Sequence, residues 1–121
     1  MKDTNELLNG LGNFTGTETW WRHWFNKSML YTDGVRFFAE SAGNGAYWLL
    51  DIIATEVFPL LKTEPFIVIE LLVESSDVAR IVASDGDDRT IWAKGLDYTD
   101  CPVGLWKFYL LDGVLLLPSE Y

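Results

Sequence analysis

The sequence predicts an α+β fold: a mainly antiparallel, hairpin-built, twisted sheet of about five to seven strands, with one principal helix packed on one face. Two observations carry this prediction. Asp-Gly dipeptides stand between runs able to pair as strands at residues 33–34, 85–86 and 112–113, and such dipeptides are a strong hairpin signal. Residues 45–61, GAYWLLDIIATEVFPLL, have the apolar spacing of a helix. The 121 residues are expected to form a single domain over 1–121.

The principal helix is expected to cover one face of the sheet. Asn44 precedes it and has a side chain that can cap the first turn. Regular geometry should end near Phe58, because Pro59 lacks a backbone N–H and disfavours helical geometry at the residue before it. The apolar residues that recur three or four positions apart and should face the sheet are Ala46, Leu49, Leu50, Ile53 and Val57.

The other elements follow from local patterns. A short helix is predicted over residues 3–11, with Thr4 as its N-cap. Residues 66–74, FIVIELLVE, are β-branched and nearly apolar throughout, which indicates a central strand. The further strand candidates are residues 20–25, 29–32, 35–40, 78–84, 89–94, 106–111 and 114–117.

The charge is one-sided, with 18 acidic residues against 9 basic ones and a net charge of −9. Such a field disfavours direct binding to nucleic acid or anionic membranes and favours a protein partner with a basic surface. Adjacent hairpin turns can bring acids to one end of a sheet, so we expect a partner-binding patch; the alternative is a merely solvated rim. The candidate residues are Glu70, Glu74, Asp77, Asp85, Asp87, Asp88, Asp97 and Asp100.

The run of residues 20–25, WWRHWF, is the most unusual stretch. In a strand, alternate side chains point to opposite faces, so both faces would carry large aromatic residues. Trp20, Trp21 and Trp24 are therefore candidate partner-binding residues, because exposed aromatic patches mark interaction sites. The alternative is that loops or the N-terminal segment bury the second face.

No catalytic, metal or cofactor site is predicted. His23 and Cys101 are the only residues of their types, and no local motif supports a nucleophile–base pair between them. A closed zinc site needs about four nitrogen or sulfur ligands, more than these two residues supply. The acidic stretch 85–88 lacks the ligand spacing of a calcium loop. A single cysteine, no signal peptide and no apolar run of about 20 residues predict a cytoplasmic protein.

Several strings spread over nearly the whole chain form a specific set. They are FTGT at 14–17, WRH at 21–23, LYTDGV at 30–35, AYWL at 46–49 with Asp51, YTD at 98–100 and DGVLLLPSEY at 112–121. This set resembles a family of small proteins of unknown function carried by phages, prophages and plasmids. The resemblance implies an origin on a mobile element and no known activity.

The leading hypothesis is a non-enzymatic mobile-element protein that binds and inhibits a host macromolecular complex, with a nucleic-acid-guided defence system as the best candidate (an anti-CRISPR-like role). One alternative is a small-ligand-binding protein or hydrolytic enzyme with a pocket between helix and sheet, using Asp51, Tyr47 or Trp48. A second alternative is a structural or oligomeric accessory protein, such as a homodimer.

Overall fold

The fold is that of a computed structural model, which describes residues 3–15 and 19–121; Gly16 and Thr17 of the FTGT string lie outside these residues. One seven-stranded sheet has the order β1-β2-β7-β6-β3-β4-β5. All neighbouring strands are antiparallel except β2 and β7, which pair in parallel. The predicted α+β class is confirmed. No helix within 3–15 and 19–121 is long and apolar enough to cross a membrane.

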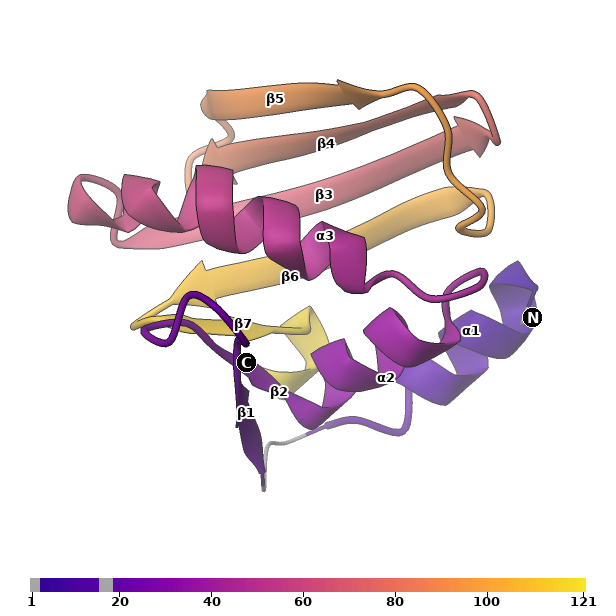
Figure 1. Ribbon diagram of the computed structural model, residues 1–121, viewed down its shortest axis with the longest axis horizontal. Helices are drawn as coiled ribbons and strands as arrows, with labels where there is room; N and C mark the ends of the chain where they lie inside the picture. Colours follow the sequence, from indigo (N-terminus) through magenta and orange to yellow (C-terminus); the bar gives the residue numbers. More distant parts are fainter. Residues whose placement is uncertain (1–2, 16–18) are drawn as a thin grey trace.

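Figure 1 shows the α-helices gathered on one side of the sheet, with α3 lying across its middle strands. The α-helices are α1 (Thr4–Leu11), α2 (Asp33–Ser41) and α3 (Tyr47–Ile52). The strands are β1 (Trp20–Arg22), β2 (Leu30–Thr32), β3 (Phe66–Ser75), β4 (Val78–Asp85), β5 (Thr90–Leu96), β6 (Gly104–Leu111) and β7 (Val114–Leu116).

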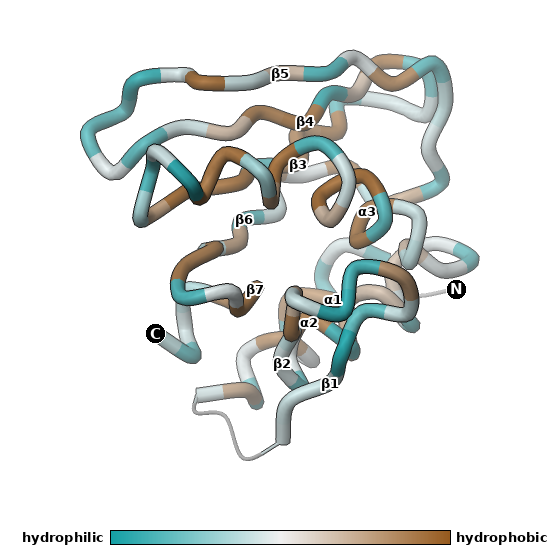
Figure 2. The backbone as a smooth tube through the Cα atoms, turned by 60° about the vertical axis from the view of Figure 1, so that its left-hand side comes forward, coloured by the Kyte–Doolittle hydropathy of each residue, from teal (hydrophilic) through white to brown (hydrophobic). Residues whose placement is uncertain are grey.

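The core lies between α2, α3 and the middle strands. Side chains along β3 alternate between the buried helix side and a half-buried open side, as a strand covered on one face requires. On the helix side, Leu50, Ile53 and Val57 are buried, so the predicted helix face is confirmed. Figure 2 shows hydrophobic stretches concentrated in α3 and in strands β3, β4 and β6. The buried residues of β3 are Ile67, Ile69, Leu71 and Val73.

The principal helix changes geometry along its length. After α3 it continues as a π-helical segment, Ile53–Val57, and then as a 3₁₀ segment, Phe58–Lys62. The predicted cap at Asn44 is wrong: Ala46 holds the N-cap position and makes no side-chain capping bond. The Asn44 backbone N–H instead donates to Asp100 Oδ2 at 2.7 Å.

Residues 33–41 form helix α2, so the predicted turn at 33–34 and return strand at 35–40 are wrong. Thr32 Oγ1 accepts the Val35 N–H at 3.3 Å, which caps the helix. Gly34 has no positive φ. It is instead required by crowding, because a Cβ there would lie 2.5 Å from Leu117 Cδ1 and 2.6 Å from Glu120 Oε1. Capping and the buried spacing of residues 35, 38 and 39 outweigh the Asp-Gly turn signal.

The other predicted turns are observed with one difference in detail. Asp112 and Gly113 have φ values of 52° and 77°, and they join β6 to β7 as predicted. In the β4–β5 turn, positive φ falls on Asp88 (67°) rather than on Gly86. At the N-terminus, Asp3 rather than Thr4 caps α1, because its carboxylate accepts the Glu6 N–H at 2.8 Å.

Candidate functional site: a docked aromatic loop

The predicted strand over residues 20–25 ends at Arg22, and residues 23–28 form a loop docked on the principal helix. His23 is buried inside this loop. Its Nδ1 accepts backbone N–H bonds from Phe25 at 3.3 Å and Asn26 at 3.1 Å. The ring proton therefore lies on Nε2, which donates to Asp51 Oδ1 at 2.8 Å. This bond joins the loop to α3.

The π-helical segment provides the second attachment of loop 23–28. The Phe58 N–H donates to the Ile53 carbonyl, five residues back, instead of to Ala54. Pro59 has no N–H, so it cannot bond the Ala54 carbonyl either. The Asn26 side-chain amide donates to this released Ala54 oxygen at 3.0 Å. The irregular helix geometry thus supplies the acceptor that fixes the loop.

Trp24 belongs to this fixed loop, and 72% of its surface is exposed to solvent. Its indole Nε1–H donates to Asp51 Oδ1 at 3.0 Å. Its ring packs edge-on against Phe25, with 4.8 Å between ring centroids, and Phe25 packs edge-on against His23 at 4.4 Å. The exposed indole is therefore held by its hydrogen bond to Asp51 and by aromatic contacts with Phe25 and His23.

Aromatic residues of α3 and β1 extend this surface. Tyr47 lies one turn before Asp51 on the same side of α3, and its hydroxyl donates to Glu40 Oε1 at 3.2 Å. Burial is the main cause that raises the pKa of the Tyr47 hydroxyl, and the nearby Glu40 charge raises it further. We call Trp21, Trp24, Phe25 and Tyr47 the aromatic surface.

An ion pair links the two ends of the aromatic surface. Arg36 Nε donates to Glu40 at 2.6 Å, the same carboxylate that Tyr47 bonds. The Arg36 guanidinium also lies over the Trp21 ring, 3.8 Å from its centroid. The indole N–H of Trp21 donates to Asp33 Oδ1 at 2.9 Å, so this ring is fixed on α2 and only partly exposed.

The structure does not bring Trp20 to this surface. Trp20 is 51% exposed and borders a different hollow, beside Val114, Leu116 and Tyr121. The alternation along β1 explains the separation, because neighbouring residues of a strand point to opposite faces. Of the three predicted tryptophans, Trp21 and Trp24 belong to the aromatic surface and Trp20 lies apart.

The predicted acidic residues occupy several places. Asp77 lies in the β3–β4 turn and Asp97 follows β5 at the same end of the sheet, whereas the β4–β5 turn lies at the other end. The seven residue steps of β4 put these ends roughly 23 Å apart. The acids of that far turn are Asp85, Asp87 and Asp88.

Three of the predicted acidic residues lie outside the hairpin turns. Glu70 and Glu74 lie on β3, where Glu70 alternates with the buried residues and so belongs to the open side of the sheet. Asp100 is partly buried and holds the loop before α3 through Asn44. Asp85 accepts the Asp87 and Arg89 N–H groups and the Arg89 guanidinium; these hydrogen bonds lower its pKa. Asp85 and Asp100 therefore organise loops.

The candidate catalytic residues are not joined. Cys101 is buried, its N–H bonds Thr99 Oγ1 at 3.1 Å, and burial raises the pKa of its thiol. His23 contacts Asp51 and its own loop, and its Nδ1 lone pair already accepts two backbone N–H groups. Within residues 3–15 and 19–121, no three His, Cys, Asp or Glu side chains are grouped to hold a metal ion.

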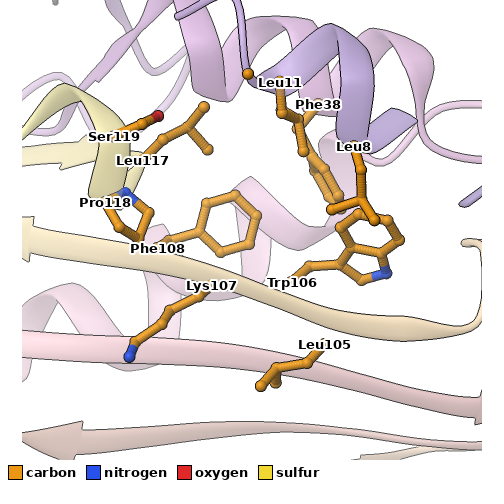
Figure 3. A pocket seen from close by; sticks show the side chains of 11 residues that line it. Leu8, Leu11, Phe38, Leu105, Trp106, Lys107, Phe108, Leu117, Pro118 and Ser119 are labelled. Atoms are coloured by element: carbon orange, nitrogen blue, oxygen red, sulfur yellow. The ribbon is translucent and has the colours of Figure 1, made fainter. Parts of the chain in front are cut away.

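An apolar pocket of about 250 Å³ lies between α1, α2, β6 and the C-terminal 3₁₀ turn Pro118–Glu120. Figure 3 shows Trp106 and Phe108 pointing into it and Leu105 and Lys107 pointing away. Asp51, Tyr47 and Trp48 do not line this pocket. This pocket is therefore not the one predicted for the enzymatic alternative, which would lie between helix and sheet and use those three residues.

Sequence reasoning missed the residues that organise the aromatic surface. The roles of Asn26, Arg36 and Glu40 depend on contacts between separate segments, and no local motif predicts these contacts. One signal was present: Arg36 and Glu40 are four residues apart, the spacing of an ion pair on a helix, but the stretch was predicted as a strand.

The fold and the surface define a small α+β protein in which a buried histidine and an aspartate hold exposed aromatic side chains. The chain belongs to a family of unknown function (DUF6876), whose sequence pattern matches residues 5–121. No curated protein and no solved structure matches it.

Proposed function

We propose that this protein is a non-enzymatic binding protein that inhibits a host macromolecular complex through its aromatic surface. The observation that carries the proposal is Trp24, which is 72% exposed and yet fixed by Asp51 and Phe25. Tryptophan is among the residues that most often dominate binding energy at interfaces. A side chain that is already ordered loses less conformational entropy when it is buried by a partner.

The charge of the chain favours a basic partner. The net charge is −9, and the acidic residues lie at both ends of the sheet, so the negative electrostatic field extends well beyond one patch. Such a field steers a basic surface toward the protein and repels nucleic acid and anionic membranes. A protein that binds nucleic acid carries a basic surface for it. We therefore favour a cytoplasmic, nucleic-acid-guided defence complex as the target, in keeping with the resemblance to proteins of phages and plasmids.

The enzymatic alternative has weaker support. Asp51 Oδ1 accepts from both His23 and Trp24, and the His23 lone pair is taken up by backbone N–H groups. A general base needs a lone pair within reach of the proton that it abstracts. The 250 Å³ pocket is lined mainly by apolar side chains and holds no pair of facing carboxylates.

Affinity capture from a bacterial lysate tests the proposal, with Trp24→Ala compared with Tyr98→Ala. Tyr98 is a matched control, because it is 69% exposed and lies outside the aromatic surface. The wild-type protein and Tyr98→Ala should retain the same complex at 0.1 M salt, and Trp24→Ala should lose most of it. Retention should also fall at 1 M salt, where the screening length shrinks from about 10 Å to about 3 Å.

Equal capture by all three proteins would overturn the role of the aromatic surface. Capture that is the same at both salt concentrations would overturn the electrostatic part and leave an aromatic-led interface.

A further inference from the structure

Within residues 3–15 and 19–121, the apolar pocket coincides with a length of strand β6 whose edge away from β3 is paired with no strand. Strand β7 pairs with only three residues of β6, Tyr109, Leu110 and Leu111. The pocket lies beside the remaining part of β6, against Leu105 to Phe108, with α1 opposite. A strand edge without a neighbour presents a row of backbone N–H and C=O groups that can pair with another extended chain.

The register shows which backbone groups face this edge. Leu111 and Val114 flank the two-residue turn, so they form a hydrogen-bonded pair, and Tyr109 with Leu116 is the next such pair. The same alternation continues along β6 to Lys107 and Leu105, whose N–H and C=O groups therefore point to the same side. In the described part of the chain, no hydrogen bond outside the sheet reaches the backbone of either residue.

Pro118 explains why the edge is open. Continuing the register, the residue opposite Lys107 would be Pro118. Proline has no N–H to donate to the Lys107 carbonyl, and the chain turns away there into the 3₁₀ segment Pro118–Glu120. The neighbouring Leu117 N–H donates to the buried Glu120 side chain, at 3.0 Å. The C-terminal segment thus leaves the sheet and forms one wall of the pocket (Figure 3).

We propose that this edge and pocket bind an extended segment of another polypeptide, which adds to the sheet beside β6 and places one large apolar side chain in the pocket. Backbone groups at strand spacing specify an extended peptide, and a pocket on one side of the strand selects every second side chain. The net charge of −9 favours basic residues on either side of the apolar one. The pocket shares no residue with the aromatic surface.

Selection from a displayed library of random linear heptapeptides tests this site. Peptides enriched on the wild-type protein should share a large apolar residue with basic neighbours. N-methylation of alternate backbone nitrogens in such a peptide should reduce its affinity about tenfold or more, because it removes the pairing N–H groups.

Variants at the edge provide matched controls. Lys107→Pro removes only the N–H that faces the open edge, which is where proline is tolerated in a strand, and should weaken the peptide about tenfold or more. Lys107→Ala keeps that N–H and should bind nearly as the wild-type protein does. Leu8→Asp places a charge at the mouth of the pocket on the half-exposed Leu8 and should also weaken binding, which covers the case in which Lys107→Pro fails to fold.

Trp24→Ala should leave peptide binding unchanged, so failure here and failure of the proposed function are distinguishable. Absence of enriched sequences, or enriched peptides that bind Leu8→Asp as they bind wild type, would overturn the proposal. Sedimentation showing a dimer that Leu8→Asp and Lys107→Pro dissociate would also overturn it, in favour of a second copy at this edge.

Discussion

Asp51 joins the loop and the helix at a single oxygen atom. Its Oδ1 accepts hydrogen bonds from the buried His23 ring and from the exposed Trp24 indole. A carboxylate is well suited to this position, because an ionised oxygen can accept several strong bonds at once. The same residue therefore fixes the base of loop 23–28 and orients its most exposed side chain.

A second single residue, Asp85, should make the free energy of unfolding depend on pH. Its hydrogen bonds with Arg89 and the turn hold the folded pKa below its ordinary value of 3.8. A carboxylate with a lowered folded pKa stabilises the protein above its unfolded pKa, and that contribution is lost as the pH falls through the folded pKa. Asp85→Asn should therefore be less stable than wild type at pH 7, and the difference should shrink as the pH falls below about 3.8.

Urea unfolding across this pH range measures the effect. Asp87→Asn is the control, because in the described chain the Asp87 carboxylate makes no hydrogen bond or ion pair. A stability difference for Asp85→Asn that stays constant from pH 7 to pH 3 would contradict this assignment.

Loop 23–28 and the principal helix depend on each other at the scale of elements. Asn26 bonds the carbonyl that the π-helical segment releases, so Asn26→Ala should leave the buried Ala54 carbonyl unpaired. The expected cost is about 1–3 kcal/mol, the penalty for a buried polar group without a partner. Amide hydrogen exchange should accelerate in residues 23–28 and remain slow in β3.

Asn44→Ala is the matched control for this prediction. The Asn44 side chain is exposed, and only its backbone N–H makes a hydrogen bond in the described structure. Equal stability of the two variants would show that the Asn26 bond does not hold the loop.

The β6–β7 turn should be sensitive to any side chain at Gly113. Its φ of 77° is strained for residues with a Cβ, and a Cβ there would also approach Ser28 O at 3.3 Å. Gly113→Val should cost about 1–3 kcal/mol in thermal or chemical unfolding. Gly95→Val should cost much less, because Gly95 lies in strand β5 with open space around its Cβ position. Similar costs at both positions would contradict the turn geometry.

The elements differ in how far the sequence predicts them. The apolar face of the helix over 45–61, the long strand β3 and the turn at 112–113 are set by local patterns, and all three are observed. Helix α2 was missed, because the Asp-Gly signal competes with a Thr32 cap and with crowding against the distant C-terminus. Loop 23–28 was missed for a similar reason: its partner atoms lie on α3, beyond any local pattern.

For the whole molecule, charge and aromatic contacts should act on different rate constants once a partner is known. Asp87→Lys together with Asp97→Lys should mainly slow association, because exposed charges act on the encounter. Both side chains are exposed and lie at opposite ends of the sheet. Trp24→Ala should mainly speed dissociation, since a desolvated aromatic contributes after docking. Surface plasmon resonance separates the two; association unaffected by charge reversal would remove electrostatic steering.

The most direct measurement is the plating efficiency of a phage on a panel of bacterial strains, each carrying one active nucleic-acid-guided defence system. The strains express the wild-type protein, Trp24→Ala or Tyr98→Ala at equal levels. We predict that the wild-type protein and Tyr98→Ala restore plating on at least one strain and that Trp24→Ala does not, because Trp24 belongs to the aromatic surface and Tyr98 does not. Restoration by none of the three proteins on any strain, or equal restoration by Trp24→Ala, would contradict the proposal.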